Sequence, residues 1–236
     1  VSVPVKGDMI DQIATISTNN DPKLGSIIAD AFRSVDNTGI VMLETAADGK
    51  TEVEVVDGVQ YDKGLTNSHF ITNAQNKSAE LENALVLLVE SPVDTIRQIQ
   101  TVLEYVIKNN KPLLIIGDLE QGVLSALAMN KKKGNIKVNV INAPTYGISK
   151  KEMLDDLALL TGATIINEDL GDDLDLIQVE HLGFCLKSVT THQETILQFN
   201  EPTEEILNII AELKKELLKD NPAHKVIKLE KRLAML

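Results

Sequence analysis

Residues 93–130 constrain the fold of this chain most, because a strand pattern lies there between two helical patterns. The first helical pattern, in residues 93–110, repeats apolar side chains along one face of a helix. Residues 113–116 form a continuous apolar run, which is typical of a strand covered on both faces. A buried strand with a helix on either side predicts an α/β fold.

The second helical pattern, in residues 121–130, is apolar around most of its circumference. Its apolar members are Val123, Leu124, Ala126, Leu127, Ala128 and Met129. A short helix of this kind is either buried on every side or exposes one apolar face to a partner. The pattern alone leaves both interpretations open, and the functional hypothesis depends on which one holds.

The rest of the chain mixes strands with helices. Apolar runs predict strands at 84–89, 136–141 and 164–166, and a helical pattern lies at 149–160. Towards the start, Asp21 and Pro22 form a signal for the beginning of a helix, and strands are predicted at 40–43 and 52–56. Towards the end, helical patterns lie at 203–217 and 223–236. We therefore expect an α/β module inserted between two ends that pack together.

Charge and cysteine content exclude several classes of protein. Acidic residues outnumber basic ones by 35 to 23, and the net charge of −12 repels phosphate, so we expect no nucleic-acid partner. The single cysteine, Cys185, excludes an internal disulfide and fits a reducing compartment. No apolar run has membrane-spanning length, so we expect no membrane association. The chain starts at Val1 and ends within a helical pattern, which suggests a fragment of a longer protein.

Familiar catalytic and metal-binding motifs are missing from the sequence. It has no phosphate-binding loop, dinucleotide fingerprint, nucleophile elbow or zinc-protease motif. The acidic residues in 168–175 do not fit calcium-loop spacing and predict a solvated loop. We predict no catalytic residue, metal or cofactor in this segment, and the Cys185 thiol is expected to be a small core group. The histidines are scattered along the chain, at His69, His181, His192 and His224.

Three functional hypotheses remain open at this point. A binding module with exposed aliphatic and methionine side chains suits partners that are apolar and variable. An α/β enzyme or small-molecule-binding domain would instead have its site at the strand ends. A purely structural scaffold would bind neither kind of partner.

Several short stretches, taken together, resemble the group I, GroEL-type chaperonins over essentially the whole chain. Their order and spacing agree with that family almost without gaps. They are residues 14–17 (ATIS), 57–64 (DGVQYDKG), 70–71, 111–116 (KPLLII), 142–144 with Gly147, and 159–162 (LLTG).

The resemblance implies a definite domain organisation. A GroEL-like apical domain, a β-sandwich flanked by helices, would span residues 58–199. It would be inserted in a small, mainly helical intermediate domain whose halves are residues 1–57 and 200–236. The equatorial domain would be absent, so ATP and Mg²⁺ are expected as cofactors of the parent protein only.

The resemblance also implies a molecular chaperone whose apical domain binds exposed apolar segments of non-native polypeptides and the loop of a GroES-like co-chaperonin lid. Each residue of that site could instead be an ordinary core residue. This alternative is strongest for Ile99 and weakest for Leu103 and Leu124. Because His69, Gln100 and Ala128 are more polar or smaller than the family's usual residues, we expect weaker or narrower client binding. The residues that correspond by position are Leu65, His69, Phe70, Ile99, Gln100, Leu103, Leu124, Ala128, Met129 and Asn130.

The remaining implications concern the whole parent protein. Its hinge would pair Gly58 with Phe199 or Asn200, and it would assemble into a homo-oligomeric ring, a heptamer in this family. The aspartate for ATP hydrolysis is expected near residues 223–225, which contain none; Asp220 lies slightly upstream. A cytoplasmic location is expected, in a bacterium or a virus-infected host cell, with the mitochondrial matrix or a plastid as alternatives.

Overall fold

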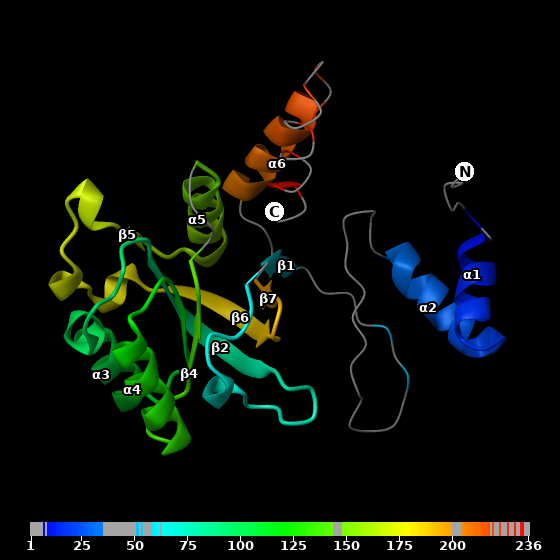
Figure 1. The fold of residues 1–236 in the computed structure, drawn as a ribbon. Coiled ribbons are helices and arrows are strands. Elements are labelled where there is room, and N and C mark those ends of the chain that lie inside the picture. The colour runs from blue at the N-terminus through cyan, green and yellow to red at the C-terminus, as the bar shows by residue number, and fades with distance from the viewer. Residues whose placement is uncertain are drawn as a thin grey trace. The chain divides into compact units, whose positions relative to one another are not determined.

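A computed structural model describes residues 7, 9–34, 51, 53, 58–61, 63–143, 148–199, 204–217, 219, 222, 226, 229 and 232–233 (Figure 1). The chain divides into two compact units, Val1–Val56 and Asp57–Leu236. Residues 200–236, expected to form half of the intermediate domain, fall in the second unit together with residues 58–199.

The first unit contains a pair of helices, α1 (Met9–Ser17) and α2 (Pro22–Ser34). The predicted start of α2 is confirmed: Oδ1 of Asp21 accepts hydrogen bonds from the backbone N–H groups of Lys23 and Leu24, at 2.9 and 3.2 Å. Small buried residues, Ala14 and Ala29, allow the helices to pack. The strand predicted at 40–43, and all but Val53 of the strand predicted at 52–56, lie outside the described residues.

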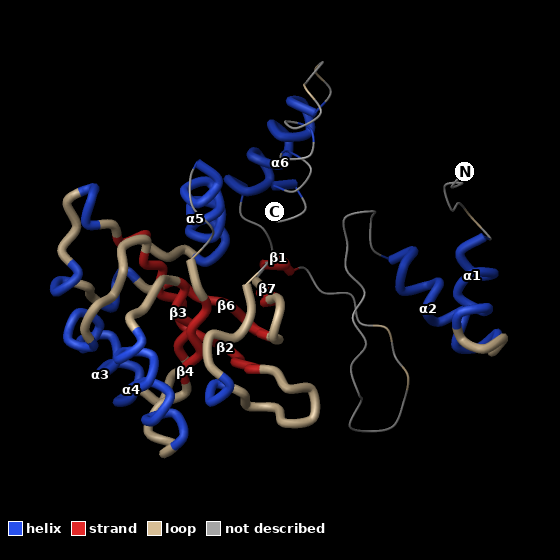
Figure 2. Tube along the Cα trace, in the orientation of Figure 1, coloured by secondary structure: helices blue, strands red, loops and turns tan. Residues whose placement is uncertain are grey.

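The second unit is built on a mixed sheet (Figure 2). Among the described residues the sheet has seven strands in the order β1-β7-β6-β2-β3-β4, with β5 paired to β2. The pairs β2–β3, β3–β4 and β2–β5 are parallel, and the other pairs are antiparallel. The strands are β1 (Gly58–Tyr61), β2 (Ala79–Val89), β3 (Leu113–Ile116), β4 (Val138–Ile141), β5 (Ile165–Ile166), β6 (Gly183–Thr190) and β7 (Thr195–Gln198).

The predicted α/β class is confirmed, whereas the two layers of a β-sandwich are replaced by one continuous hydrogen-bonded sheet. The long strands β2 and β6 pair over most of their length and join the parallel half to the antiparallel half. The sheet curls enough to bring β4 to β6, because Nδ2 of Asn139 donates a hydrogen bond of 2.8 Å to Oγ1 of Thr190. Both of these side chains are fully buried.

Most of the predicted helices form in the second unit. The helix predicted at 93–110 begins later, as a 3₁₀ turn, because Oε1 of Gln98 accepts hydrogen bonds from the backbone N–H groups of Asp94 and Thr95. Most of the helix predicted at 223–236 lies outside the described residues. The α-helices are α3 (Gln100–Lys108), α4 (Gln121–Lys132), α5 (Ile148–Thr161) and α6 (Glu204–Leu217), and the 3₁₀ turns are η1 (Ser68–Phe70), η2 (Ile96–Ile99), η3 (Glu168–Leu170), η4 (Leu174–Leu176) and η5 (Val179–His181).

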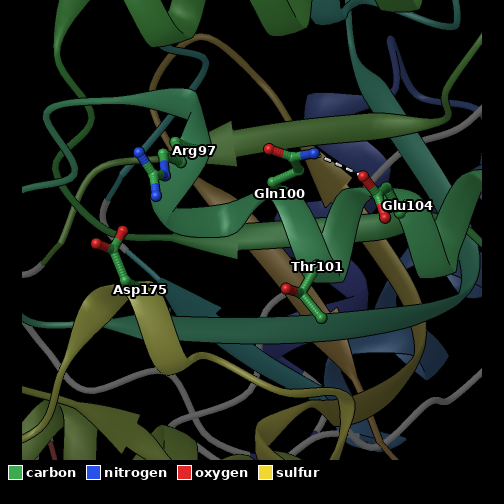
Figure 3. Close-up of a pocket in the computed structure, with 5 residues that line it drawn as sticks. All are labelled: Arg97, Gln100, Thr101, Glu104 and Asp175. Carbon is green, nitrogen blue, oxygen red and sulfur yellow. Dashed lines mark hydrogen bonds between the residues drawn. The ribbon is translucent and has the colours of Figure 1, made fainter.

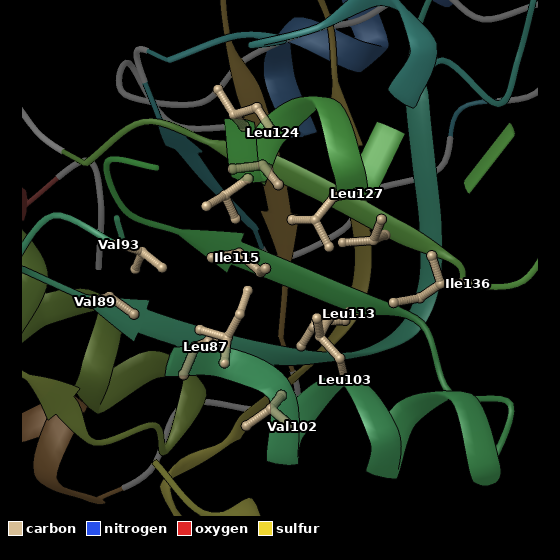
Figure 4. Close-up of a cluster of buried hydrophobic side chains, with 14 of the residues drawn as sticks. Leu87, Val89, Val93, Val102, Leu103, Leu113, Ile115, Leu124, Leu127 and Ile136 are labelled. Atoms are coloured by element: carbon tan, nitrogen blue, oxygen red, sulfur yellow. The ribbon is translucent and has the colours of Figure 1, made fainter. Parts of the chain in front are cut away.

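Alternation along the strands divides the core into two clusters. On one face of the sheet, Leu113 and Ile115 of β3 pack with side chains of α3, α4 and η1. On the other face, Leu114 and Ile116 pack with Leu157 of α5 and with the antiparallel strands. Figure 4 shows side chains of α3 and α4 that reach the strands from the first face. The core therefore holds α3 and α4 on the same side of β3.

A buried hydroxyl inside the curled sheet gives a first prediction. Oγ of Ser188 has no hydrogen-bond partner in the described part of the chain, and Ser188 is fully buried. Because an unpaired buried polar group is costly, Ser188→Ala is expected to keep or raise the free energy of unfolding, by up to about 1 kcal/mol. Urea denaturation measures the change.

Thr190→Val is the matched control for this prediction. Oγ1 of Thr190 accepts a hydrogen bond of 2.8 Å from Nδ2 of Asn139 and lies 3.1 Å from Oγ1 of Thr195, within hydrogen-bond distance. Its replacement is expected to cost about 1–3 kcal/mol, because the buried amide of Asn139 loses its acceptor. Equal losses in Ser188→Ala and Thr190→Val would contradict the assignment of an unpaired hydroxyl at Ser188.

Candidate functional site

Three segments that are distant in sequence meet on the helical face of the sheet. They are the stretch around η1, the η2–α3 segment and α4. Six of the ten residues in the predicted binding site belong to this one cluster or pack against it: Leu65, Phe70, Ile99, Leu103, Leu124 and Ala128. The spacing of residues along the sequence did not reveal this convergence.

Burial separates the predicted residues into two groups. Phe70 and Ile99 expose nothing, so they support the surface from below and do not face solvent. Leu103 and Leu124 are each 8% exposed and point mainly into the core. Met129, by contrast, is 60% exposed at the solvent side of α4. Two interpretations were open for α4: burial on every side, or one apolar face exposed to a partner. Both hold in part, since most of its apolar side chains lie in the core and Met129 is open to a partner.

Ile107 extends the apolar surface beyond the predicted set. It is half exposed and lies four residues after Leu103, on the stripe of α3 that also carries Gln100. The helical spacing of the sequence contained this signal. We call Leu103, Ile107, Leu124 and Met129 the apolar surface of α3 and α4.

A lysine fastens the η1 segment to α4. Nζ of Lys131 donates hydrogen bonds to the backbone carbonyls of His69 and Ile71, at 3.0 and 2.5 Å. Burial lowers the pKa of Lys131. The side chain of Asn67 accepts a hydrogen bond of 2.9 Å from the backbone N–H of His69 and fixes the same turn. The sequence pattern did not predict this role of Lys131, because its hydrogen-bond partners lie about sixty positions away in the chain.

Gln100, at the start of α3, also borders a polar part of the surface. Nε2 of Gln100 donates a hydrogen bond of 2.6 Å to Oε1 of Glu104, its neighbour one turn later. These residues help to form a surface pocket of about 210 Å³ (Figure 3). Its lining is entirely polar: Arg97, Gln100, Thr101, Glu104 and Asp175.

Asn130 and His69 have local structural contacts. Nδ2 of Asn130 donates to the carbonyl of Ala126 at 2.9 Å, and its Oδ1 accepts from Nδ2 of Asn135 at 3.3 Å, so it closes the end of α4. His69 is exposed, with Nδ1 2.9 Å from Oδ1 of Asn67. Of the two, His69 is the more open to a partner.

Two of the three predicted hinge residues, Gly58 and Phe199, lie near one another at the edge of the sheet. Gly58 begins β1 and is opposite Gln198 of β7 in the antiparallel register. Phe199 directly follows this strand and packs against the second core cluster. Asn200 lies outside the described residues, as do Asp220 and residues 223–225.

The carboxyl edge of the parallel strands is where an α/β enzyme would have its site. Polar side chains there bind neighbouring loops. Nδ2 of Asn167 donates to Oε2 of Glu90 at 2.6 Å, and Oγ of Ser91 accepts from the backbone N–H of Glu168 at 2.9 Å. Oδ1 of Asp118 accepts a hydrogen bond from the backbone N–H of Ala143 at 3.3 Å. These contacts give the polar residues of this edge a structural role.

The remaining reactive groups of the described ranges are buried, or are exposed without metal-ligand partners. Within the described ranges, no three His, Cys, Asp or Glu side chains come together as metal ligands. Cys185 is buried in β6, and burial raises the pKa of its thiol to about 12, as expected for a small core residue. The acidic residues predicted to form a solvated loop, including Glu168 and Asp175, are exposed.

Two further observations concern the chain as a whole. None of the helices in the described part is both long and apolar enough to cross a membrane. No protein-family model matches the sequence.

Proposed function

We propose that this chain is the polypeptide-binding module of a chaperonin-like protein and binds apolar segments of non-native proteins. The observation that carries the proposal is the meeting of the η1 segment, α3 and α4 on one core cluster, with Ile107 and Met129 exposed on the two helices. These are the segments that the resemblance assigns to client binding. A lid loop of a GroES-like co-chaperonin would use the same surface.

The composition of this surface supports weak binding of short segments. Leu103 and Leu124 offer little exposed area, so most of the apolar contact comes from Ile107 and Met129. Burial is worth about 25 cal/mol per Å², so two partly exposed side chains supply only a few kcal/mol. The exposed Gln100 and His69 favour clients that carry polar groups beside their apolar residues.

The parent protein in this proposal is an ATP-driven ring chaperonin. ATP and Mg²⁺ would bind in an equatorial domain outside this chain, and the parent would form a homo-oligomeric ring in the cytoplasm or a related organelle. Mutating Asp220 in that parent and measuring its ATPase activity tests whether this residue takes the place of the aspartate expected at 223–225.

Met129→Ser is expected to weaken the binding of an apolar peptide about fivefold, because most of a methionine side chain loses its apolar contact with the peptide. Gln100→Leu is expected to strengthen the same binding, by a similar factor, since it adds apolar area beside Leu103. Fluorescence anisotropy with a labelled apolar peptide measures both changes. Both side chains are exposed, so the free energy of unfolding is expected to stay nearly constant.

Leu170→Ser is the matched control. Leu170 is 72% exposed on η3, an element outside α3 and α4, and its loss is expected to leave peptide binding unchanged. The proposal fails if Leu170→Ser weakens binding as much as Met129→Ser. It also fails if Met129→Ser and Gln100→Leu both leave binding at the wild-type level.

A further inference from the structure

Exposed lysines gather where α3 and α4 end. The strands β2, β3 and β4 are parallel, so each helix returns from the end of one strand to the start of the next. Both helices therefore run in the same direction and end at the same edge of the sheet. Residues 105–117 and 121–151, which include these ends, contain lysines and no acidic residue. We call the exposed lysines there, up to the start of β4, the basic helix ends: Lys108, Lys111, Lys132, Lys133 and Lys137.

The basic helix ends carry more positive charge than the two helices use. The C-terminus of a helix has about half a unit of negative charge, so two helices offset about one of these positive charges. None of the lysines of the basic helix ends forms an ion pair within the described ranges. Glu104, one turn before Lys108, accepts a hydrogen bond of 2.6 Å from Gln100 instead. Most of the positive charge is therefore available to a partner.

These lysines lie beside the exposed members of the apolar surface of α3 and α4. Met129 comes three and four residues before Lys132 and Lys133 at the end of α4, and residues at this spacing are neighbours on one face of a helix. On α3, Lys108 directly follows Ile107. A bound segment that covers Met129 or Ile107 therefore brings its own neighbouring residues close to the lysines.

We propose that the basic helix ends select client segments in which acidic residues flank the apolar ones. The apolar residues of such a segment cover Met129 and Ile107, and its carboxylates meet ammonium groups that have no ion-pair partner in the described part of the chain. The inference rests on the proposed function, because it uses the same surface, and it names the kind of client segment that this surface prefers.

The charge of the whole chain predicts the opposite preference, since a protein with a net charge of −12 repels acidic peptides. Distance decides between the two effects. Screening limits the reach of exposed charges to about 10 Å at 0.1 M salt. The 12 residues of α4 span about 18 Å, so Glu120, at the start of this helix, lies beyond that reach from Lys132. The lysines next to Met129 are therefore expected to outweigh the distant carboxylates.

Three labelled peptides with the same apolar residues test the proposal on the full chain. The apolar residues are followed by a pair of aspartates, serines or lysines. At about 0.1 M salt the aspartate peptide is expected to bind about fivefold more tightly than the serine peptide, and the lysine peptide more weakly than either. At about 1 M salt the three affinities are expected to agree within about twofold. Fluorescence anisotropy measures the dissociation constants.

A double variant, Lys132→Gln with Lys133→Gln, is expected to bind the aspartate and serine peptides about equally. Lys214→Gln with Lys215→Gln is the matched control, because these exposed lysines also lie in the last turn of a helix, α6, and their loss changes the net charge by the same amount. This control is expected to keep the preference for the aspartate peptide. The four lysines form no ion pair within the described ranges, so both variants are expected to fold.

The outcomes separate this inference from the proposed function. If the serine peptide binds and the aspartate peptide binds no more tightly, the inference is overturned and the proposed function stands. Equal loss of the preference in the two double variants also overturns it, because the net charge of the chain, and not the basic helix ends, would then set the preference. If none of the three peptides binds, the proposed function fails and the inference fails with it.

Discussion

The Gly64→Ala substitution is expected to lower the free energy of unfolding by about 3 kcal/mol, because the added methyl group has no space. An ideal Cβ at this position would lie 2.3 Å from both the carbonyl carbon and the oxygen of His192, and 2.6 Å from the backbone nitrogen of Gln193. These atoms belong to the backbone and cannot rotate away as a side chain would. One of the two segments must therefore move.

Such a movement would break contacts that hold the η1 segment to the sheet. The backbone N–H of Leu65 donates a hydrogen bond of 2.9 Å to the carbonyl of Thr191, and Oγ1 of Thr195 donates one of 2.6 Å to the carbonyl of Lys63. Since Leu65 belongs to the candidate site, Gly64→Ala is also expected to weaken binding of the apolar peptide. Urea denaturation measures the first effect and fluorescence anisotropy the second.

Gly122→Ala provides the control at a glycine with a flexible neighbour. Its ideal Cβ would meet only the side chain of Glu120, with Oε2 at 3.0 Å, in the first turn of α4. Alanine is favoured over glycine in helices by about 1 kcal/mol, so this variant is expected to keep or gain stability. If Gly64→Ala were as stable as Gly122→Ala, the close approach of the η1 segment to residues 191–194 would not matter for the fold.

The spacing of apolar residues along the sequence predicted the helices and strands well, but it did not predict the tertiary contacts between them. Apolar spacing located α4, α5 and β3 because each side chain's place on a helix or strand follows from its number alone. The same spacing could not show that Asn139 meets Thr190, since the curl of a sheet depends on all its strands. One continuous sheet thus replaced the expected β-sandwich.

The candidate site shows the same limit at the level of side chains. Helical spacing placed Leu103 and Leu124 on apolar faces, but what covers a face is decided by elements distant in sequence. Here the strands cover both leucines, and the exposed apolar side chains of α3 and α4 are instead Ile107 and Met129. Lys131 is a further residue of the site that the sequence did not predict. Its two carbonyl partners are set by the path of the η1 segment, and no local sequence pattern indicates them.

A buried ion pair between α5 and the C-terminal segment gives the second large effect. The side chain of Asp156 is 1% exposed, and the guanidinium of Arg232 donates to both of its carboxylate oxygens, with shortest distances of 2.7 and 2.8 Å. Removing one partner of such a pair leaves a buried charge without compensation. Arg232→Met is therefore expected to lower the free energy of unfolding at neutral pH by about 3 kcal/mol.

The pH dependence of the loss identifies its cause. Burial raises the pKa of Asp156, and the hydrogen bonds and charge of Arg232 oppose this effect. A carboxyl group whose pKa is raised by folding binds a proton more readily in the folded state, so its effect on stability becomes less favourable as pH rises through that pKa. Without Arg232 the pKa of Asp156 rises further. The free energy of unfolding of Arg232→Met is therefore expected to fall with increasing pH over a wider pH range than that of the wild type.

Denaturation of Arg232→Met at pH values from about 4 to about 7 is thus expected to show a small loss of stability at the acidic end and the full loss at neutral pH. Lys219→Met is the control, since Lys219 pairs with Glu216 at the surface and its removal is expected to cost about 0–1 kcal/mol at either pH. In the double variant Asp156→Leu with Arg232→Met, most of the lost stability is expected to return, because no buried charge remains. A loss in Arg232→Met that did not change with pH would mean that packing of the arginine stem, and not the charge of Asp156, is what the pair contributes.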